Sequence, residues 1–309
     1  MVSQGAAQCP VRLLAFFVPH YVDRGQTEVE CRTPKLTPIF SGISLMYGEI
    51  VMRKYLYLFS ILFALSFMTS NTAFAVKYGS LDGEEHPYVG LMFAHDGVYG
   101  WRCSGTLVSP TVFVTAGHCT EGAVFATVYF DSDAEYLKSE NVWVGGSTGL
   151  PFTHPSYIPQ AFFVFDAGVV VLDEPYDLSE YAALPEADEL DAMKTRRGKQ
   201  DTTFTAVGYG LQWINPVFVQ SDWVRMSATP RLIQINVPGF TGDFSMLLSN
   251  NHSTGGTCYG DSGGPNFIGD SNVIGGVTSY GINSNCAGTG GVYRLDKQHN
   301  LDFINSFLP

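Results

Sequence analysis

The segment Cys-Tyr-Gly-Asp-Ser-Gly-Gly-Pro at residues 258–265 constrains this chain more than any other stretch. Its three glycines within five positions allow backbone angles that residues with a Cβ atom adopt only at a cost. A tight loop can therefore turn its amide N–H groups inward and expose one hydroxyl. We interpret Ser262 as a nucleophile, which requires a nearby base and a third group that orients the base, because a serine hydroxyl is poorly reactive at neutral pH.

Composition narrows the class of protein. With 309 residues, 45% of them hydrophobic, the chain can form one large or two ordinary domains around a sizeable core. The net charge of −12 and the lack of a basic cluster argue against nucleic-acid binding, which depends on phosphate contacts, and against acidic membrane surfaces. No CxxC pair or Cys/His cluster has zinc-ligand spacing, so we expect neither a structural metal of that kind nor a cofactor.

Residues 52–75 have the composition of a secretory signal peptide. Arg53 and Lys54 precede an apolar run over residues 55–67, and a small-residue cleavage site follows that ends at Ala75. The run is shorter than the ~20 residues that span a bilayer, so a permanent anchor is the weaker alternative. We expect a secreted protein, extracellular or periplasmic, in which the four downstream cysteines can form two disulfides.

Residues 1–51 precede a signal that must be N-terminal to work as one. We therefore expect translation to begin at Met52 and residues 1–51 to be absent from the native product. In a bacterial gene, the codons of Gly48 and Glu49 could supply a purine-rich ribosome-binding site. Recovery of Cys9 or Cys31 in secreted protein would overturn this hypothesis.

The mature part, residues 76–309, predicts an all-β fold. Short segments rich in β-branched and aromatic residues alternate with turn residues, as in barrels and sandwiches. A terminal helix is predicted after Asp296, where Leu301 and Ile304 recur at helical spacing. The charged stretch 178–200 is expected to be a solvated junction between two halves. The expected strands are 88–93, 106–108, 112–115, 124–130, 168–172, 203–208, 231–237, 273–280 and 291–294.

Two further motifs, Cys-Ser-Gly-Thr-Leu at 103–107 and Thr-Ala-Gly-His-Cys at 115–119, precede the serine loop. Together, and in this order, the motifs make the chain resemble the chymotrypsin/trypsin-like serine peptidases over essentially its whole mature length, as a secreted, bacterial member. The resemblance implies two six-stranded antiparallel β-barrels with a C-terminal helix. It also implies hydrolysis of peptide bonds through an acyl-enzyme.

A base and an orienting acid complete the expected catalytic triad. His118 is the base, and we choose Asp166 as the acid because a charge at the start of the apolar run 168–172 would be costly unless it were paired. Asp173 follows that run and is interpreted as a turn residue. An ionised Asp166 would hold the tautomer of His118 that accepts the proton of Ser262.

The resemblance also assigns the residues that surround the triad. The N–H groups of Gly260 and Ser262 would bind the oxyanion, a stabilisation typically worth ~3 kcal/mol. Ser279, Tyr280 and Gly281 would pair with the extended substrate, and Ser279 would contact the triad acid. The implied disulfides are Cys103–Cys119 and Cys258–Cys286. An acidic loop offers a minor calcium alternative, although most such runs are solvated; its candidate ligands are Asp131, Asp133 and Glu135.

Specificity is argued from the expected floor of the substrate pocket. Tryptic members have an aspartate at the position of Gly256, and Thr257 follows. Gly281 and Gly291 match the opposite wall, and no acid occurs from 282 to 291. A buried basic side chain would lack a counter-charge, so we expect a preference for Phe, Tyr, Leu or Met on the acyl side.

The resemblance also implies how the enzyme would be activated. In this family a new amino terminus pairs with the acid before the nucleophile, here Asp261, and Val76 is the matching residue. Cleavage after Ala75 would release it directly.

We expect a monomer that acts on proteins or peptides, without nucleic-acid partners and without membrane contact after signal cleavage. The alternatives are a catalytically silent homologue that serves as a binding module, and an esterase with the same triad.

Overall fold

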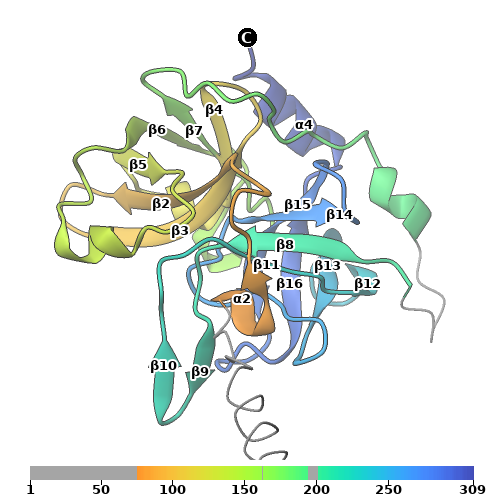
Figure 1. The fold of residues 1–309 in the computed structure, drawn as a ribbon. Helices are drawn as coiled ribbons and strands as arrows, with labels where there is room; N and C mark the ends of the chain where they lie inside the picture. The colour runs from red at the N-terminus through yellow and green to blue at the C-terminus, as the bar shows by residue number, and fades with distance from the viewer. Residues whose placement is uncertain (1–74, 162, 194–200) are drawn as a thin grey trace, which may run out of the picture. The chain divides into compact units, whose positions relative to one another are not determined.

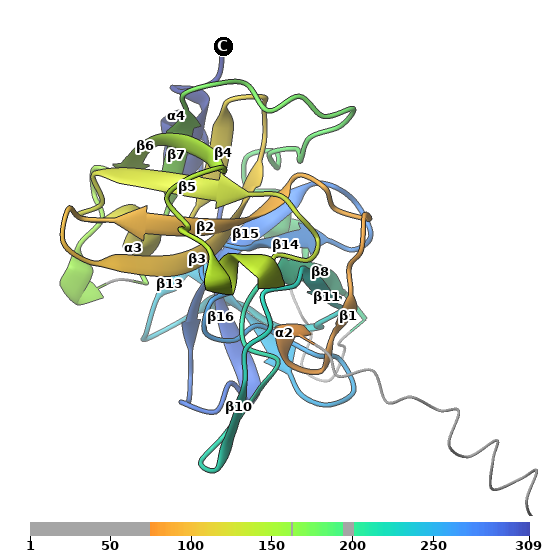
Figure 2. The same cartoon turned by 60° about the vertical axis from the view of Figure 1, so that its left-hand side comes forward.

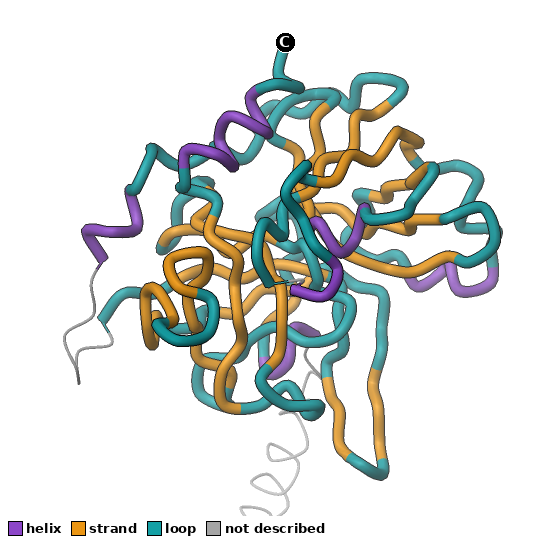
Figure 3. The backbone as a smooth tube through the Cα atoms, turned by 180° about the vertical axis from the view of Figure 1, so that it is seen from behind, coloured by secondary structure: helices purple, strands orange, loops and turns teal. Residues whose placement is uncertain are grey.

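Two groups of strands organise the described part of the chain (Figure 1). The computed structural model describes residues 75–161, 163–193 and 201–309, so residues 1–51 and all of the expected signal peptide except Ala75 lie outside the described residues. Seen from behind, strands and their connecting loops account for nearly all of the path, with a few short helices between them (Figure 3). The prediction of an all-β fold is confirmed.

The first group closes into a six-stranded barrel in the order β2-β3-β4-β7-β6-β5, with antiparallel neighbours throughout. Alternate residues along its strands point inward, and fully buried Leu91, Phe113 and Val169 contribute to the core. The strands are β2 (Val89–His95), β3 (Gly100–Leu107), β4 (Val112–Thr115), β5 (Phe125–Tyr129), β6 (Ser147–Thr153) and β7 (Gly168–Leu172).

The second group forms one eight-stranded sheet in the order β1-β11-β8-β14-β15-β16-β13-β12. A separate hairpin of β9 and β10 extends away from both groups, as two views agree (Figures 1 and 2). The strands are β1 (Ser80–Leu81), β8 (Phe204–Gly208), β9 (Trp213–Asn215), β10 (Phe218–Gln220), β11 (Met226–Ala228), β12 (Leu232–Val237), β13 (Gly242–Asn250), β14 (Pro265–Ile268), β15 (Ile274–Gly281) and β16 (Gly288–Arg294).

Helices are short, and the predicted terminal helix is present. In α4 (Gln298–Asn305), Leu301 and Ile304 are buried, which confirms the helical spacing from which it was predicted. None of the helices in the described ranges is long and apolar enough to cross a membrane. The others are α2 (Ala75–Tyr78), α3 (Gly117–Thr120) and the 3-10 turns η1 (Glu135–Ser139), η2 (Pro159–Ala161) and η3 (Glu189–Met193).

A buried arginine ties the two groups of strands together. Arg225, which precedes β11, is fully buried, and its Nε lies 3.0 Å from Oδ2 of Asp82. Its Nη1 donates to the carbonyl of Phe130, the residue that follows β5, over 2.9 Å. Because a buried guanidinium is costly without partners, these contacts fix how the barrel meets the sheet.

Candidate active site

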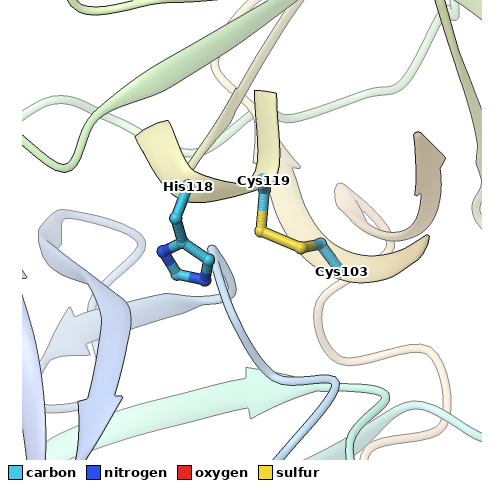
Figure 4. A group of neighbouring side chains, drawn as sticks. All are labelled: Cys103, His118 and Cys119. Carbon is cyan, nitrogen blue, oxygen red and sulfur yellow. A yellow bond between two sulfur atoms is a disulfide. The ribbon is translucent and has the colours of Figure 1, made fainter. Parts of the chain in front are cut away.

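His118 is held by a short helix that a disulfide fastens to the barrel. It lies on α3 next to Cys119, which is bonded to Cys103 of β3 with a Cα–Cα distance of 6.2 Å (Figure 4). The second disulfide, Cys258–Cys286, has a Cα–Cα distance of 5.2 Å. Both pairings expected from the resemblance are confirmed. Because both sulfurs beside His118 are consumed by the disulfide, this group is not a metal site.

Asp166 lies against His118 and is completely buried. Its Oδ1 accepts the backbone N–H of His118 over 2.8 Å, and its Oδ2 lies 2.9 Å from the ring Nδ1. Ser279 donates its hydroxyl to the same Oδ2 over 2.6 Å, which is the contact expected from the sequence. The carboxylate therefore has a fixed orientation, and the Nε2 atom of His118 is the ring nitrogen left for another partner.

The environment of His118 shifts its proton affinity in two directions. Burial lowers the pKa of the imidazole, whereas the charge of Asp166 and its hydrogen bond raise it. The net result is a pKa above the ordinary value of 6.5. The imidazolium form is thus stabilised by the carboxylate, as a base that must hold a proton transiently requires.

Hydrogen bonds from β3 hold the serine loop against the barrel. The Ser104 N–H donates to the carbonyl of Ser262 over 2.8 Å, and the Ser104 hydroxyl donates to the carbonyl of Gly260 over 2.9 Å. Gly260 has a φ of +96° and Gly263 a φ of +78°, angles that favour glycine. The loop is therefore bent around Ser262 as the glycine spacing predicts.

Ser262 and His118 border one cavity of about 500 Å³. No direct hydrogen bond joins their side chains among the described contacts, as is common in substrate-free enzymes, where such bonds tighten when substrate binds. The backbone N–H groups of Gly260 and Ser262 donate to no described group. Ser262 and His118 thus border the same cavity, and two amide donors of the serine loop have no partner among the described contacts.

Four of the expected substrate-binding residues line this cavity: Thr257, Ser279, Tyr280 and Gly281. Neither Gly291 nor its neighbour Gly290 is among the residues that border the cavity, so the predicted place of Gly291 on the opposite wall stays a prediction. A methyl group placed on Gly290 would lie 3.3 Å from Oγ1 of Thr257, whereas one on Gly291 would run into the ring of Tyr280. Successive residues of a strand face opposite sides, so Gly290 faces Thr257 and Gly291 faces Tyr280, two residues that line the cavity.

Gly256 directly precedes Thr257, which lines the cavity, but is not itself a lining residue. A side chain there would project onto Asn250, whose Cγ is 2.5 Å from the ideal Cβ position. The Asn250 amide thus occupies the space that a longer residue at 256 would fill. Sequence reasoning missed Asn250 because it lies on β13, for which no strand was predicted.

Two aromatic rings lie next to Tyr280, which lines the cavity. The ring centroids of Phe163 and Phe240 are 4.6 Å apart, and those of Phe240 and Tyr280 are 5.6 Å apart. Phe240 is 56% exposed. An apolar surface therefore adjoins the strand that was expected to pair with substrate.

Asp261 is fully buried beneath the serine loop. Its carboxylate accepts the N–H groups of Gly210 over 2.7 Å and of Cys258 over 2.8 Å, and it forms no ion pair within the described ranges. Burial raises the pKa of Asp261 to about 7, although those two hydrogen bonds and the charge of Arg102 lower it. This carboxylate lacks the full counter-charge that would keep it ionised.

The segment around Val76 docks next to the pocket floor. Val76 is fully buried and packs with Met226 and Ala228. The carbonyl of the next residue, Lys77, accepts the N–H of Gly256 over 3.0 Å. In the uncleaved chain the Val76 nitrogen belongs to a peptide bond and carries no charge, so it cannot neutralise Asp261.

The acidic loop does not gather into a cation site. Its three carboxylates are not among the clusters of described residues that could hold a metal ion. Asp131 accepts the hydroxyl of Tyr136, Asp133 accepts the N–H of Glu135, and Glu135 pairs with Lys138. These local partners engage one oxygen of Asp131, one of Asp133 and both of Glu135.

Comparison with known proteins identifies the family of this chain. The model of the Trypsin family matches residues 80–300. A trypsin of Saccharopolyspora erythraea is 29% identical over 214 residues, covering 68% of this chain and 88% of the relative. A chymotrypsin of Phaedon cochleariae is 29% identical over 218 residues, covering 67% and 72%.

A solved structure is similar as well. The structure of HL collagenase superposes with a TM-score of 0.59 at 19% identity, covering 74% of this chain and 97% of that one. At that identity the similarity shows the fold alone. Because the family model spans more than half of the sequence, the chain belongs to the trypsin family of serine proteases.

Proposed function

We propose that this protein is a secreted serine endopeptidase in which Ser262, His118 and Asp166 act as the catalytic triad. The observation that carries the proposal is that Asp166, completely buried, binds Nδ1 of His118 while His118 and Ser262 border the same cavity. Family membership supports peptidase chemistry. None of the three residues is replaced, which disfavours a silent homologue.

The proposed reaction follows from these positions. The Ser262 oxygen attacks the carbonyl carbon of the scissile peptide, and its proton passes to Nε2 of His118. The oxyanion is bound by the free N–H groups of Gly260 and Ser262. Collapse of the intermediate expels the amine, which takes the proton from His118, and leaves an ester on Ser262. Water then attacks the ester with His118 again as the base, releasing the acid and restoring the hydroxyl.

The cavity supports a preference for large apolar or aromatic residues on the acyl side. No residue that lines it is Asp, Glu, Lys or Arg, so a buried basic side chain would lack a counter-charge. The exposed ring of Phe240 beside Tyr280 supports apolar contacts further along the substrate. Cleavage only after Lys or Arg in a peptide panel would refute this preference.

We propose further that export alone activates the enzyme. Signal cleavage after Ala75 would convert the Val76 nitrogen to an ammonium group that can neutralise Asp261 and order the oxyanion loop. An α-amino group titrates near ~8, and pairing would raise this value, so activity would persist below the raised pKa and be lost at strongly alkaline pH. Mature protein that begins at any other residue would contradict this model.

A mixed peptide library tests the proposed function. Purified mature protein is incubated with the library, products are identified by mass spectrometry, and Ser262→Ala is the matched control. We expect cleavage by the wild type alone, after large apolar residues. Hydrolysis of esters without cleavage of any peptide would identify an esterase instead, and binding of peptides without cleavage would favour the silent homologue.

A further inference from the structure

Gly260 joins two peptide planes of the serine loop and is the residue about which they rotate most easily. Its φ of +96° lies in a region open to glycine, where no Cβ atom restrains the neighbouring planes. The plane before it contains the Gly260 N–H, one of the proposed oxyanion donors, and is held because the Tyr259 carbonyl accepts the N–H of Leu211 over 2.8 Å. The plane after it leads to the N–H of Ser262, the other proposed donor. The two donors converge on one oxygen only if this second plane is fixed as well.

The side chain of Ser104, on β3, holds the second plane. Ser104 is fully buried, and its hydroxyl donates to the carbonyl of Gly260 over 2.9 Å. The same hydroxyl oxygen accepts the N–H of Tyr209, which follows β8, over 3.1 Å. A backbone N–H only donates and a backbone carbonyl only accepts, so the single hydroxyl proton must lie toward Gly260. The barrel thus reaches the most flexible joint of the loop through one hydrogen bond of fixed direction.

The backbone of Ser104 holds the same loop two residues further on. Its N–H donates to the carbonyl of Ser262 over 2.8 Å. One residue therefore bonds the carbonyls of both residues whose N–H groups are the proposed oxyanion donors. Among the described contacts, the Ser104 hydroxyl is the only donor to the Gly260 carbonyl. Removing the hydroxyl would release that carbonyl while the backbone bond to Ser262 remained.

We propose that Ser104 is a positioning residue that sets the geometry of the oxyanion hole through the carbonyl of Gly260. This inference rests on the proposed peptidase function and adds to it a residue outside the triad and the serine loop. Ser104 does not border the cavity, so it acts through Gly260 and touches no substrate. Its contribution appears when the substrate carbonyl oxygen acquires charge, because the loop N–H groups bind that charge most strongly in the transition state.

Steady-state kinetics of Ser104→Ala on one apolar peptide test the proposal. We expect kcat to fall about 10- to 30-fold, less than the ~10²- to 10³-fold cost of losing an oxyanion donor, because the donor is displaced and not removed. KM should stay within about twofold of the wild type, since substrate binding in the ground state does not use the hole. Active-site titration gives the concentration of competent enzyme. A wild-type kcat, or a loss that lies entirely in KM, would overturn the proposal.

A peptide aldehyde and the peptide alcohol of the same sequence separate the geometry of the hole from general damage. The Ser262 oxygen adds to the aldehyde carbon, and the oxygen of the resulting hemiacetal takes the place of the oxyanion, whereas the alcohol binds without this step. We expect the inhibition constant of the aldehyde to rise about tenfold in Ser104→Ala and that of the alcohol to stay unchanged. Equal weakening of both inhibitors would make Ser104 merely structural and would refute the assigned role.

Thr106 provides a matched control on the same face of β3. It is fully buried, and its hydroxyl donates to the carbonyl of Tyr88 over 3.2 Å, outside the serine loop. Thr106→Val should lower the melting temperature but leave kcat and both inhibition constants within about twofold of the wild type. A loss of kcat in Thr106→Val as large as that in Ser104→Ala would count against the proposal.

Two further comparisons keep the outcome decisive. If Ser104→Ala does not fold, Ser104→Cys keeps the size of the side chain and only weakens the donor, so the aldehyde should still lose affinity relative to the alcohol; an unchanged ratio would overturn the proposal. Absence of peptide cleavage by the wild type, or cleavage by Ser262→Ala, would defeat the proposed function and this inference with it. Normal cleavage by Ser104→Ala would defeat this inference alone.

Discussion

Replacing Asp166 with asparagine should force the wrong proton onto His118. In the native protein Oδ1 accepts the backbone N–H of His118, while Oδ2 faces the ring Nδ1 and the hydroxyl of Ser279. The backbone donor requires an oxygen at the first position, so the asparagine NH₂ group would replace Oδ2. It would donate to Nδ1 and leave the ring proton on Nε2, where His118 could no longer accept the proton of Ser262.

The expected loss of kcat in Asp166→Asn follows from the loss of the correct His118 tautomer. The wrong tautomer in other triads of this type costs ~10⁴ in kcat, which corresponds to about 5.5 kcal/mol of transition-state stabilisation. The fold should survive, because asparagine has the shape of aspartate and keeps the backbone hydrogen bond. Ser279→Ala removes only one charge-assisted hydrogen bond to Asp166, so we expect a milder loss of about 10- to 100-fold.

Steady-state kinetics on one apolar peptide would measure both losses. Circular dichroism and thermal melting of Asp166→Asn serve as controls for folding. A kcat for Asp166→Asn within tenfold of the wild type would refute the assignment of Asp166 to the triad. A larger loss for Ser279→Ala than for Asp166→Asn would equally contradict the geometry.

Three further outcomes follow from the structure. Since Asp166 raises the pKa of His118 above 6.5, kcat/KM should increase with pH through a midpoint above 6.5, and a midpoint below that value in a pH–rate profile would contradict the pairing. Removing the Cys258–Cys286 disulfide, which spans 28 residues, should lower the free energy of unfolding by about 3.5 kcal/mol in chemical denaturation. Gly256→Asp should destabilise the fold without conferring cleavage after Lys or Arg, because its Cβ would meet the Asn250 side chain; gain of tryptic cleavage in a stable variant would argue against this packing.

Much of the barrel could be predicted from the sequence because its strands carry strong local signals. The expected segments 112–115 and 168–172 coincide with β4 and β7, both rich in buried β-branched residues. In contrast, β6 (Ser147–Thr153) contains glycine and proline and has alternating exposure, so its propensity is weak. Its place is fixed by pairing with β5 and β7, which a single sequence does not specify.

Both disulfides, and His118 and Ser262 of the proposed triad, were predictable because short motifs lie around them. The residues of the pocket were harder to predict, for a geometric reason. A shift of one residue along a strand reverses the face on which a side chain lies, so a single sequence does not decide which of Gly290 and Gly291 faces Thr257 and which faces Tyr280. No local sequence signal marks Asn250, since its contact with Gly256 depends on β13 passing next to that residue.

Trapping the acyl-enzyme tests the central claim most directly. Mature protein is mixed with a slowly deacylated ester of an aromatic amino acid, quenched in acid and analysed by intact mass and peptide mapping. We predict one acyl group per chain, attached to Ser262, and no adduct in Ser262→Ala. An unmodified Ser262 in protein that cleaves peptides, or an acyl group on another residue, would contradict the account.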